Sequence, residues 1–173
     1  WIGQARRHST SRLVNHFIEA GFIQSGLECA KSHKSAFASS LAYAEVFSGI
    51  GNHYGDQEDF KTSIAYYREA LTKHEEAPLI HFNLALALER LGNTSEALQG
   101  YQRAIELDPK ITVAHLNRGA ILARDPKRLA EGITSLQQAV RLNPNLAASY
   151  YHLGMAFERS RNFQSAFDNY RKA

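Results

Sequence analysis

Three glycines in the first third of the sequence are of the residue type that binds phosphate. Gly49, Gly51 and Gly55 lie close together, much as in loops whose backbone N–H groups cradle phosphate at a helix start. The third glycine is misplaced for such a loop, and no strand pattern precedes the cluster. The glycines therefore do not predict a nucleotide site.

The eight histidines and the single cysteine could ligate a metal. The histidines are scattered, and no His-x-x-x-His pair or second cysteine accompanies them. His81 and His115 are better explained as core histidines, and Cys29 as a buried thiol at a small-residue position. We therefore expect no metal, no cofactor and no catalytic residue, and a protein that is not an enzyme.

The elements that position these residues form a repeat. Small residues recur 34, 34 and 35 residues apart at Gly51, Ala85, Gly119 and Gly154, so the period is 34 with a one-residue insertion. A second small residue follows at Ser63, Ala97, Gly132 and Ala166, and then a large one at Tyr67, Tyr101, Leu136 and Tyr170. Small residues let two helices approach closely, while the large residue fills the gap to the next unit.

This pattern resembles the tetratricopeptide repeat, whose unit is a helix, a turn and an antiparallel helix with a closing proline. Asp108-Pro109 and Asn143-Pro144 close units here, and the resemblance covers about Ala44 to Ala173. It implies an all-α protein, an α-solenoid of about four repeats after a degenerate N-terminal helical hairpin. The predicted divisions are a basic arm at 1–11, a degenerate or capping hairpin at 12–43, and repeats at 44–77, 78–111, 112–146 and 147–173. The third repeat holds the insertion and the fourth is incomplete.

The turn inside each repeat is predicted from residues that tolerate left-handed backbone. Gly55-Asp56, Gly92-Asn93 and Arg161-Asn162 interrupt the helical pattern midway through their units. The inserted residue falls within 124–127, the matching turn of the third unit, where an insertion is tolerated.

Charge and composition narrow the partners and the compartment. The net charge is +3, with 17 acidic residues among 20 basic ones, which is too mild to predict nucleic-acid binding. No apolar run approaches the roughly 20 residues that span a bilayer. One cysteine indicates an intracellular, reducing location, cytoplasmic by default. The Arg- and Ser-rich stretch before Glu19, the first acidic residue, leaves a mitochondrial location as the alternative.

The resemblance further implies that the first helix of each unit lines a concave, partner-binding groove. Asn83 and Asn117 stand two residues before a small position, and an amide suits the backbone of an extended peptide. The predicted partner-binding residues are Phe82, Asn83, Leu86, Arg90, Leu116, Asn117, Arg124, Tyr151, His152, Met155 and Arg159. Such a groove favours an extended or helical segment with apolar anchors and some acidic side chains. The alternative is that the arginines only balance helix dipoles and the neighbouring Glu89 and Glu158.

The predicted function is a scaffold or adaptor that binds a partner protein, as a subunit of a larger assembly. The alternative is a substrate-docking arm of a larger enzyme, similar to the repeat arm of O-linked N-acetylglucosamine transferase. Relatives that capture acidic chaperone tails share Asn52 and Asn83, but Ser48, Val113 and Asn117 stand where those relatives have cations. We therefore do not expect that ligand.

Overall fold

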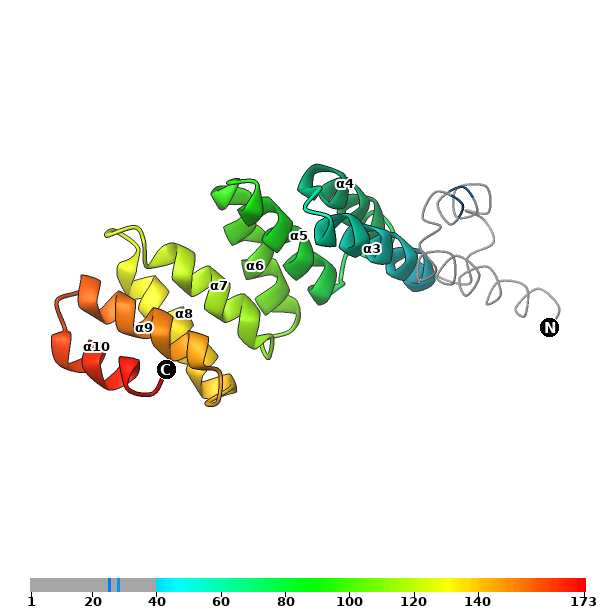
Figure 1. Ribbon diagram of the computed structural model, residues 1–173. Coiled ribbons are helices and arrows are strands. Elements are labelled where there is room, and N and C mark those ends of the chain that lie inside the picture. The colour runs from blue at the N-terminus through cyan, green and yellow to red at the C-terminus, as the bar shows by residue number, and fades with distance from the viewer. Residues whose placement is uncertain (1–24, 26–27, 29–39) are drawn as a thin grey trace. The chain divides into compact units, whose positions relative to one another are not determined.

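The computed structural model describes Ser25, Glu28 and residues 40–173. The predicted arm at 1–11 and nearly all of the predicted hairpin at 12–43 lie outside the described residues. The helices, labelled as in Figure 1, are α3 (Ser40–Asp56), α4 (Phe60–Leu71), α5 (Pro78–Arg90), α6 (Thr94–Leu107), α7 (Thr112–Leu122), α8 (Leu129–Leu142), α9 (Ala147–Arg159) and α10 (Phe163–Tyr170). The predicted all-α class of repeated helical hairpins is confirmed for this part of the chain.

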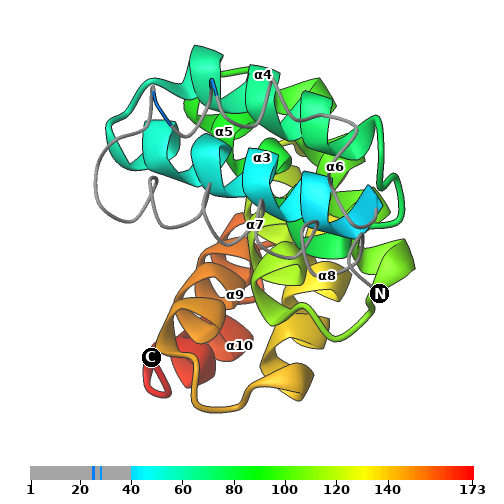
Figure 2. The same cartoon turned by 90° about the vertical axis from the view of Figure 1, so that its right-hand side faces the viewer.

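The chain divides into two compact units, Trp1–Asn93 and Thr94–Ala173. In the first unit, α4 packs against both α3 and α5. In the second unit each helix from α6 to α10 packs against the next, and α7 also contacts α9. Figures 1 and 2 show α3 beside α4, and α9 beside α10. The division between the units falls at the turn after α5, inside the predicted repeat 78–111.

The helices of a hairpin touch where the sequence places its small residues. A Cβ atom added to Gly51 would lie 2.7 Å from the ring of Tyr67, far inside van der Waals contact. Gly154 on α9 stands in the same relation to Tyr170 on α10, also at 2.7 Å. The small and large positions of the repeat are therefore partners, because only a missing side chain lets the large one close the gap.

Local sequence explains where several helices begin. Asp59 accepts a hydrogen bond from the backbone N–H of Thr62 at the start of α4, at 3.2 Å. Asn162 accepts one from Ser165 at the start of α10, at 3.1 Å. These side chains satisfy donors that a helix start leaves unpaired. Pro78 opens α5, where a missing N–H costs nothing.

Two of the three predicted left-handed turns are confirmed, and one is corrected. Gly92 and Arg161 have φ angles of +82° and +60° between their helices, so both turns lie where predicted. In the second turn the left-handed residue is Arg161 and not Asn162, whose φ is −90°. Gly55-Asp56 was predicted as the matching turn, but both residues belong to α3. The left-handed residue is Glu58 (φ +61°), which lies 34 residues before Gly92. The capping side chain of Asp59 sets where α4 starts, and a helix tolerates a glycine at a cost of only about 1 kcal/mol.

Two histidines fasten the first helix of a repeat to the turn before it. A ring nitrogen, Nε2, of His81 lies 2.7 Å from the carbonyl oxygen of Glu75, and Nε2 of His115 lies 3.0 Å from that of Pro109. The two histidines thus make the same contact, six residues back, in consecutive repeats. His115 is 9% exposed and His81 is half-buried.

Candidate peptide-binding site

A pocket of about 570 Å³ opens in the first unit among α3, α4 and α5. Three of the predicted binding residues, Asn83, Leu86 and Arg90, line it together from α5. The remaining lining residues are Asn52, Gly55, Asp56, Glu58, Phe60, Ser63, Tyr67 and Ala87. We call it the α3–α5 pocket. Because α5 has 3.6 residues per turn, the spacing of three and four residues puts the predicted side chains on one face.

A fixed group of polar side chains forms one wall of this pocket. Oδ1 of Asn52 accepts two hydrogen bonds, one from the Tyr67 hydroxyl at 2.7 Å and one from Nδ2 of Asn83 at 3.0 Å. Burial raises the pKa of Tyr67, so its phenol stays protonated and remains a donor. The two amides are thereby oriented before any partner arrives.

The same bonds leave hydrogen-bonding capacity at the pocket surface. A primary amide has two N–H donors and an oxygen with two lone pairs. In the described part of the chain, the N–H groups of Asn52 and the side-chain oxygen of Asn83 have no bond within the protein. The pair can therefore offer both donors and an acceptor to a peptide backbone.

The charges at the pocket are mixed. Arg90 is exposed at the last residue of α5, while Asp56 and Glu58 are exposed where α3 meets the turn. The predicted basic edge is therefore accompanied by two carboxylates. Those carboxylates disfavour a partner that is acidic along its whole length.

The second asparagine, Asn117, is held by a repeat tyrosine in the second unit. Nδ2 of Asn117 donates to the Tyr101 hydroxyl at 3.2 Å, and Tyr101 is fully buried. Leu116 beside it is 8% exposed and packs in a core cluster with Leu136 and Leu153. Leu116 therefore stabilises the core and offers little surface to a partner.

The predicted residues of α9 divide between surface and structure. Tyr151 is 51% exposed, and its ring lies 5.6 Å from that of His152 and 6.0 Å from that of Tyr170. Met155 is half-buried. Nη1 of Arg159 donates to the carbonyl oxygen of Ala123 at 2.9 Å, which satisfies an acceptor at the end of α7.

The arginines therefore play different parts. Arg159 caps a neighbouring helix, as the alternative interpretation of the helix-end arginines has it. Arg124 is exposed beyond the end of α7, and Arg90 lines the α3–α5 pocket. Phe82 is half-buried on α5.

Several pocket residues were not among the predicted set. Asn52 is the most important, because it joins Tyr67 to Asn83. Two signals indicated it: its place directly after Gly51, and its match to an asparagine of the relatives that capture acidic chaperone tails. Asp56 and Glu58 were missed because the turn was predicted at Gly55-Asp56. The helix α3 in fact continues to Asp56, which changes the side chains that reach the pocket.

The chain belongs to the tetratricopeptide repeat family. A model of that repeat matches residues 49–110 and 117–173, more than half of the sequence. Proteins of this family are generally peptide- or protein-binding modules. Among the described helices, none is long and apolar enough to cross a membrane.

Individual relatives share the repeat and differ in what surrounds it. Protein O-mannosyl-transferase Tmtc2 of Drosophila melanogaster is 33% identical over 93 residues, which are 51% of this chain and 10% of that protein. The chain thus spans about a tenth of this relative. The crystal structure of YrrB, "a TPR protein with an unusual peptide-binding site", is 23% identical, with a TM-score of 0.78 over 94% of this chain and 82% of that one. The first repeat domain of Spaghetti, bound to an HSP90 peptide, is 24% identical, with a TM-score of 0.68 over 71% and 97%.

Proposed function

We propose that this chain is a scaffold or adaptor that binds an extended segment of a partner protein, with the α3–α5 pocket as a principal contact. The observation that supports this most is the Asn52–Asn83 pair, which Tyr67 holds in place. Binding a partner loses less conformational entropy when the side chains that contact it are already ordered. Its action is non-covalent, and the chain is not itself an enzyme.

The chemistry of the pocket defines the partner. The two amides bind the backbone of an extended segment, and Leu86 offers an apolar contact for one anchoring side chain. Arg90 suits one acidic side chain at the edge, while Asp56 and Glu58 repel a run of them. This argues against the acidic tail of a chaperone, for which Ser48, Val113 and Asn117 also lack the cations.

The remaining predicted residues extend the proposal to the second unit. Asn117, Tyr151, His152 and Met155 keep exposed or half-exposed side chains that a partner of this unit can contact. A surface of this kind suits a subunit of a larger assembly in a reducing compartment of the cell.

A second candidate is a docking arm of a larger glycosyltransferase. It is favoured by the 33% identity to a protein named as an O-mannosyl-transferase, of which the chain spans a tenth. The same pocket would then bind a substrate protein, and catalysis would reside elsewhere. Sequencing the full-length transcript distinguishes the two, because only the second candidate requires a catalytic domain in the same polypeptide.

A peptide-display selection tests the proposal. A library of extended segments is selected on the wild-type chain, and the recovered peptides are measured against Asn83→Ala and Arg90→Ala by calorimetry. We expect about a tenfold loss for Asn83→Ala, since a lost hydrogen bond leaves its partner unpaired. Lys73→Ala, an exposed lysine outside the pocket, is the control. Peptides that bind all four proteins equally would rule out this pocket.

A further inference from the structure

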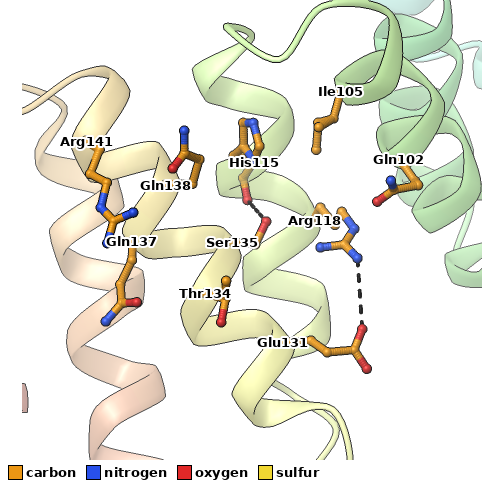
Figure 3. A pocket seen from close by; sticks show the side chains of 10 residues that line it. All are labelled: Gln102, Ile105, His115, Arg118, Glu131, Thr134, Ser135, Gln137, Gln138 and Arg141. Atoms are coloured by element: carbon orange, nitrogen blue, oxygen red, sulfur yellow. Dashed lines mark hydrogen bonds and ion pairs between the residues drawn. The ribbon is translucent and has the colours of Figure 1, made fainter.

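A hollow of about 420 Å³ lies in the second unit among α6, α7 and α8, and no predicted partner-binding residue lines it. Figure 3 shows the side chains around it, with those of α8 along one side and those of α6 and α7 along the other. Its lining residues include Arg118 on α7 and Gln137, Gln138 and Arg141 on α8. We call it the α6–α8 cleft.

Arg118 occupies a position that the other repeats fill with an apolar residue. Ile50 and Leu153, each one residue before the small position, are buried, and Leu84 is half-buried. The side chain of Arg118 is 21% exposed, and burial lowers its pKa. Moving a charge out of water is costly unless it is well paired. An aliphatic residue would pack better at this position. The presence of an arginine is therefore not explained by the stability of the fold.

The pairing of Arg118 within the protein is weak. Its Nη2 lies 3.9 Å from Oε2 of Glu131, the ion pair drawn in Figure 3. Arg128 holds the same carboxylate more closely, with Nη2 at 2.8 Å from Oε2 and Nε at 3.3 Å from Oε1. A guanidinium has five N–H donors. Glu131 is thus engaged by Arg128, and most donors of Arg118 remain available to a ligand.

The surroundings of Arg118 are positively charged and rich in amides. Arg141 also lines the cleft, and a neighbouring hollow of about 390 Å³ shares Gln102 and Arg118 and adds Arg128. The two hollows together have three guanidinium groups and one carboxylate. In the described residues, Gln137 and Gln138 make no side-chain bond within the protein, so their amides can bind a peptide backbone.

We propose that the α6–α8 cleft binds a carboxylate side chain on a segment of a partner protein. Arg118 receives the carboxylate through paired N–H donors, the geometry in which a guanidinium binds it best. Gln137 and Gln138, on α8, bind the backbone of the segment. Ser135, whose hydroxyl donates to the carbonyl oxygen of His115 at 2.9 Å, fixes α8 against α7 at the base of the cleft.

This site is separate from the surface that Asn117 belongs to. Asn117 and Arg118 are consecutive on α7, and consecutive residues of a helix point about 100° apart. A variant of Asn83 or Asn117 that loses its partner should therefore still bind at the cleft. If the cleft binds nothing, the proposed function of the α3–α5 pocket is unaffected.

The test uses a fluorescein-labelled peptide of alternating glutamate and serine, and the same peptide with glutamine for glutamate. Binding to the whole chain is measured by fluorescence anisotropy at low salt. The variants are Arg118→Leu, which restores the residue type of the other repeats, and Arg103→Leu. Arg103 is a half-buried arginine on α6 that does not line the cleft, and its Nη1 lies 3.6 Å from Oε2 of Glu106. Thermal unfolding confirms that both variants fold.

We expect Arg118→Leu to weaken binding of the glutamate peptide about tenfold or more, and Arg103→Leu to change it less than about twofold. The glutamine peptide should bind as weakly to the wild type as the glutamate peptide does to Arg118→Leu. Equal affinities of the wild type and Arg118→Leu would overturn the proposal, as would equal binding of the two peptides. Free glutarate is then added as a competitor of the labelled peptide. If glutarate binds as tightly as the peptide, the cleft is a small-anion site, and the proposal of a protein-binding site is wrong.

Discussion

Asn83 donates a hydrogen bond from Nδ2 to Oδ1 of Asn52, 3.0 Å away, and so connects the first helices of two consecutive repeats. The same oxygen accepts from Tyr67, the large residue of the first repeat. The side-chain amide of Asn52 therefore makes both bonds only when the two hairpins are stacked as in this structure. The binding surface and the packing that supports it share these three side chains.

The first prediction concerns two glycines of α3 that differ only in what they face. Gly51→Ala should lower the free energy of unfolding by about 1–3 kcal/mol, because the new Cβ would lie 2.7 Å from the Tyr67 ring. Gly49→Ala should raise it by about 0.5–1 kcal/mol, since nothing lies within 4 Å and alanine favours helix. Urea denaturation measures both, and two changes of the same sign would contradict the packing described.

The second prediction concerns the left-handed turns. Glu58→Gly should stabilise the chain by up to about 1 kcal/mol, because glycine adopts a φ of +61° without the steric cost of a side chain. Gly92→Ala, at the equivalent turn, should destabilise it by a similar amount. Thermal melts of the two variants against the wild type check the pair. No shift for Gly92→Ala would show that the turn relaxes.

The third prediction is a pH dependence that His115 causes. Burial lowers the pKa of this histidine, and the bond to Pro109 only partly opposes the effect. In the unfolded chain this histidine takes up a proton near its ordinary pKa of 6.5, whereas in the folded chain it takes up the proton only at a lower pH. The stabilisation is complete above pH 6.5 and is lost as the pH falls toward the folded pKa.

The measurement is the free energy of unfolding between pH 8 and pH 5, for the wild type and His115→Phe. Phenylalanine stands at the equivalent position of the first repeat, as Phe47, and is buried there. His115→Phe should reduce the loss of stability at low pH. The control is His81→Phe, which removes the same carbonyl contact from a half-buried ring. If His115→Phe retains the full slope, another group causes it.

The fourth prediction concerns the start of α10. Asn162→Ala should destabilise the α9–α10 hairpin by about 1 kcal/mol, because the N–H of Ser165 loses its acceptor. Hydrogen exchange of the α10 amides should accelerate, while exchange in α7 should change little. Gln164→Ala, an exposed residue on the same helix, is the control. Uniform acceleration across the second unit would show that α10 does not open by itself.

The repeat could be predicted because it depends only on the number of residues between recurring small and large positions, which can be read directly from the sequence. A period of 34 residues with small and large positions predicts where helices approach closely, and Gly51 is such a place. The large residue was expected to fill the gap to the next unit, but Tyr67 packs against Gly51 of its own hairpin. The turn at Glu58 could not be predicted from residue preference, because glutamate is not a residue that favours left-handed backbone.

The binding residues were less predictable because exposure depends on the neighbouring repeat. Leu116 and Tyr151 share one repeat position, yet Leu116 is buried and Tyr151 is half exposed. Leu116 packs in one cluster with Leu153, which the next hairpin supplies. Arg159 likewise finds its acceptor, the carbonyl of Ala123, on the preceding hairpin. A repeat read by itself contains neither partner.

The most direct test of the central claim is site-specific photo-cross-linking from the α3–α5 pocket. A benzophenone side chain replaces Leu86 in the full-length protein, and Ala65, exposed on α4 outside the pocket, provides the matched control. After irradiation with native partners, mass spectrometry identifies the cross-linked segment. We predict one extended segment joined to position 86 and not to position 65, and lost when Asn83→Ala is added. A segment joined equally to both positions, or unaffected by Asn83→Ala, would contradict binding in this pocket.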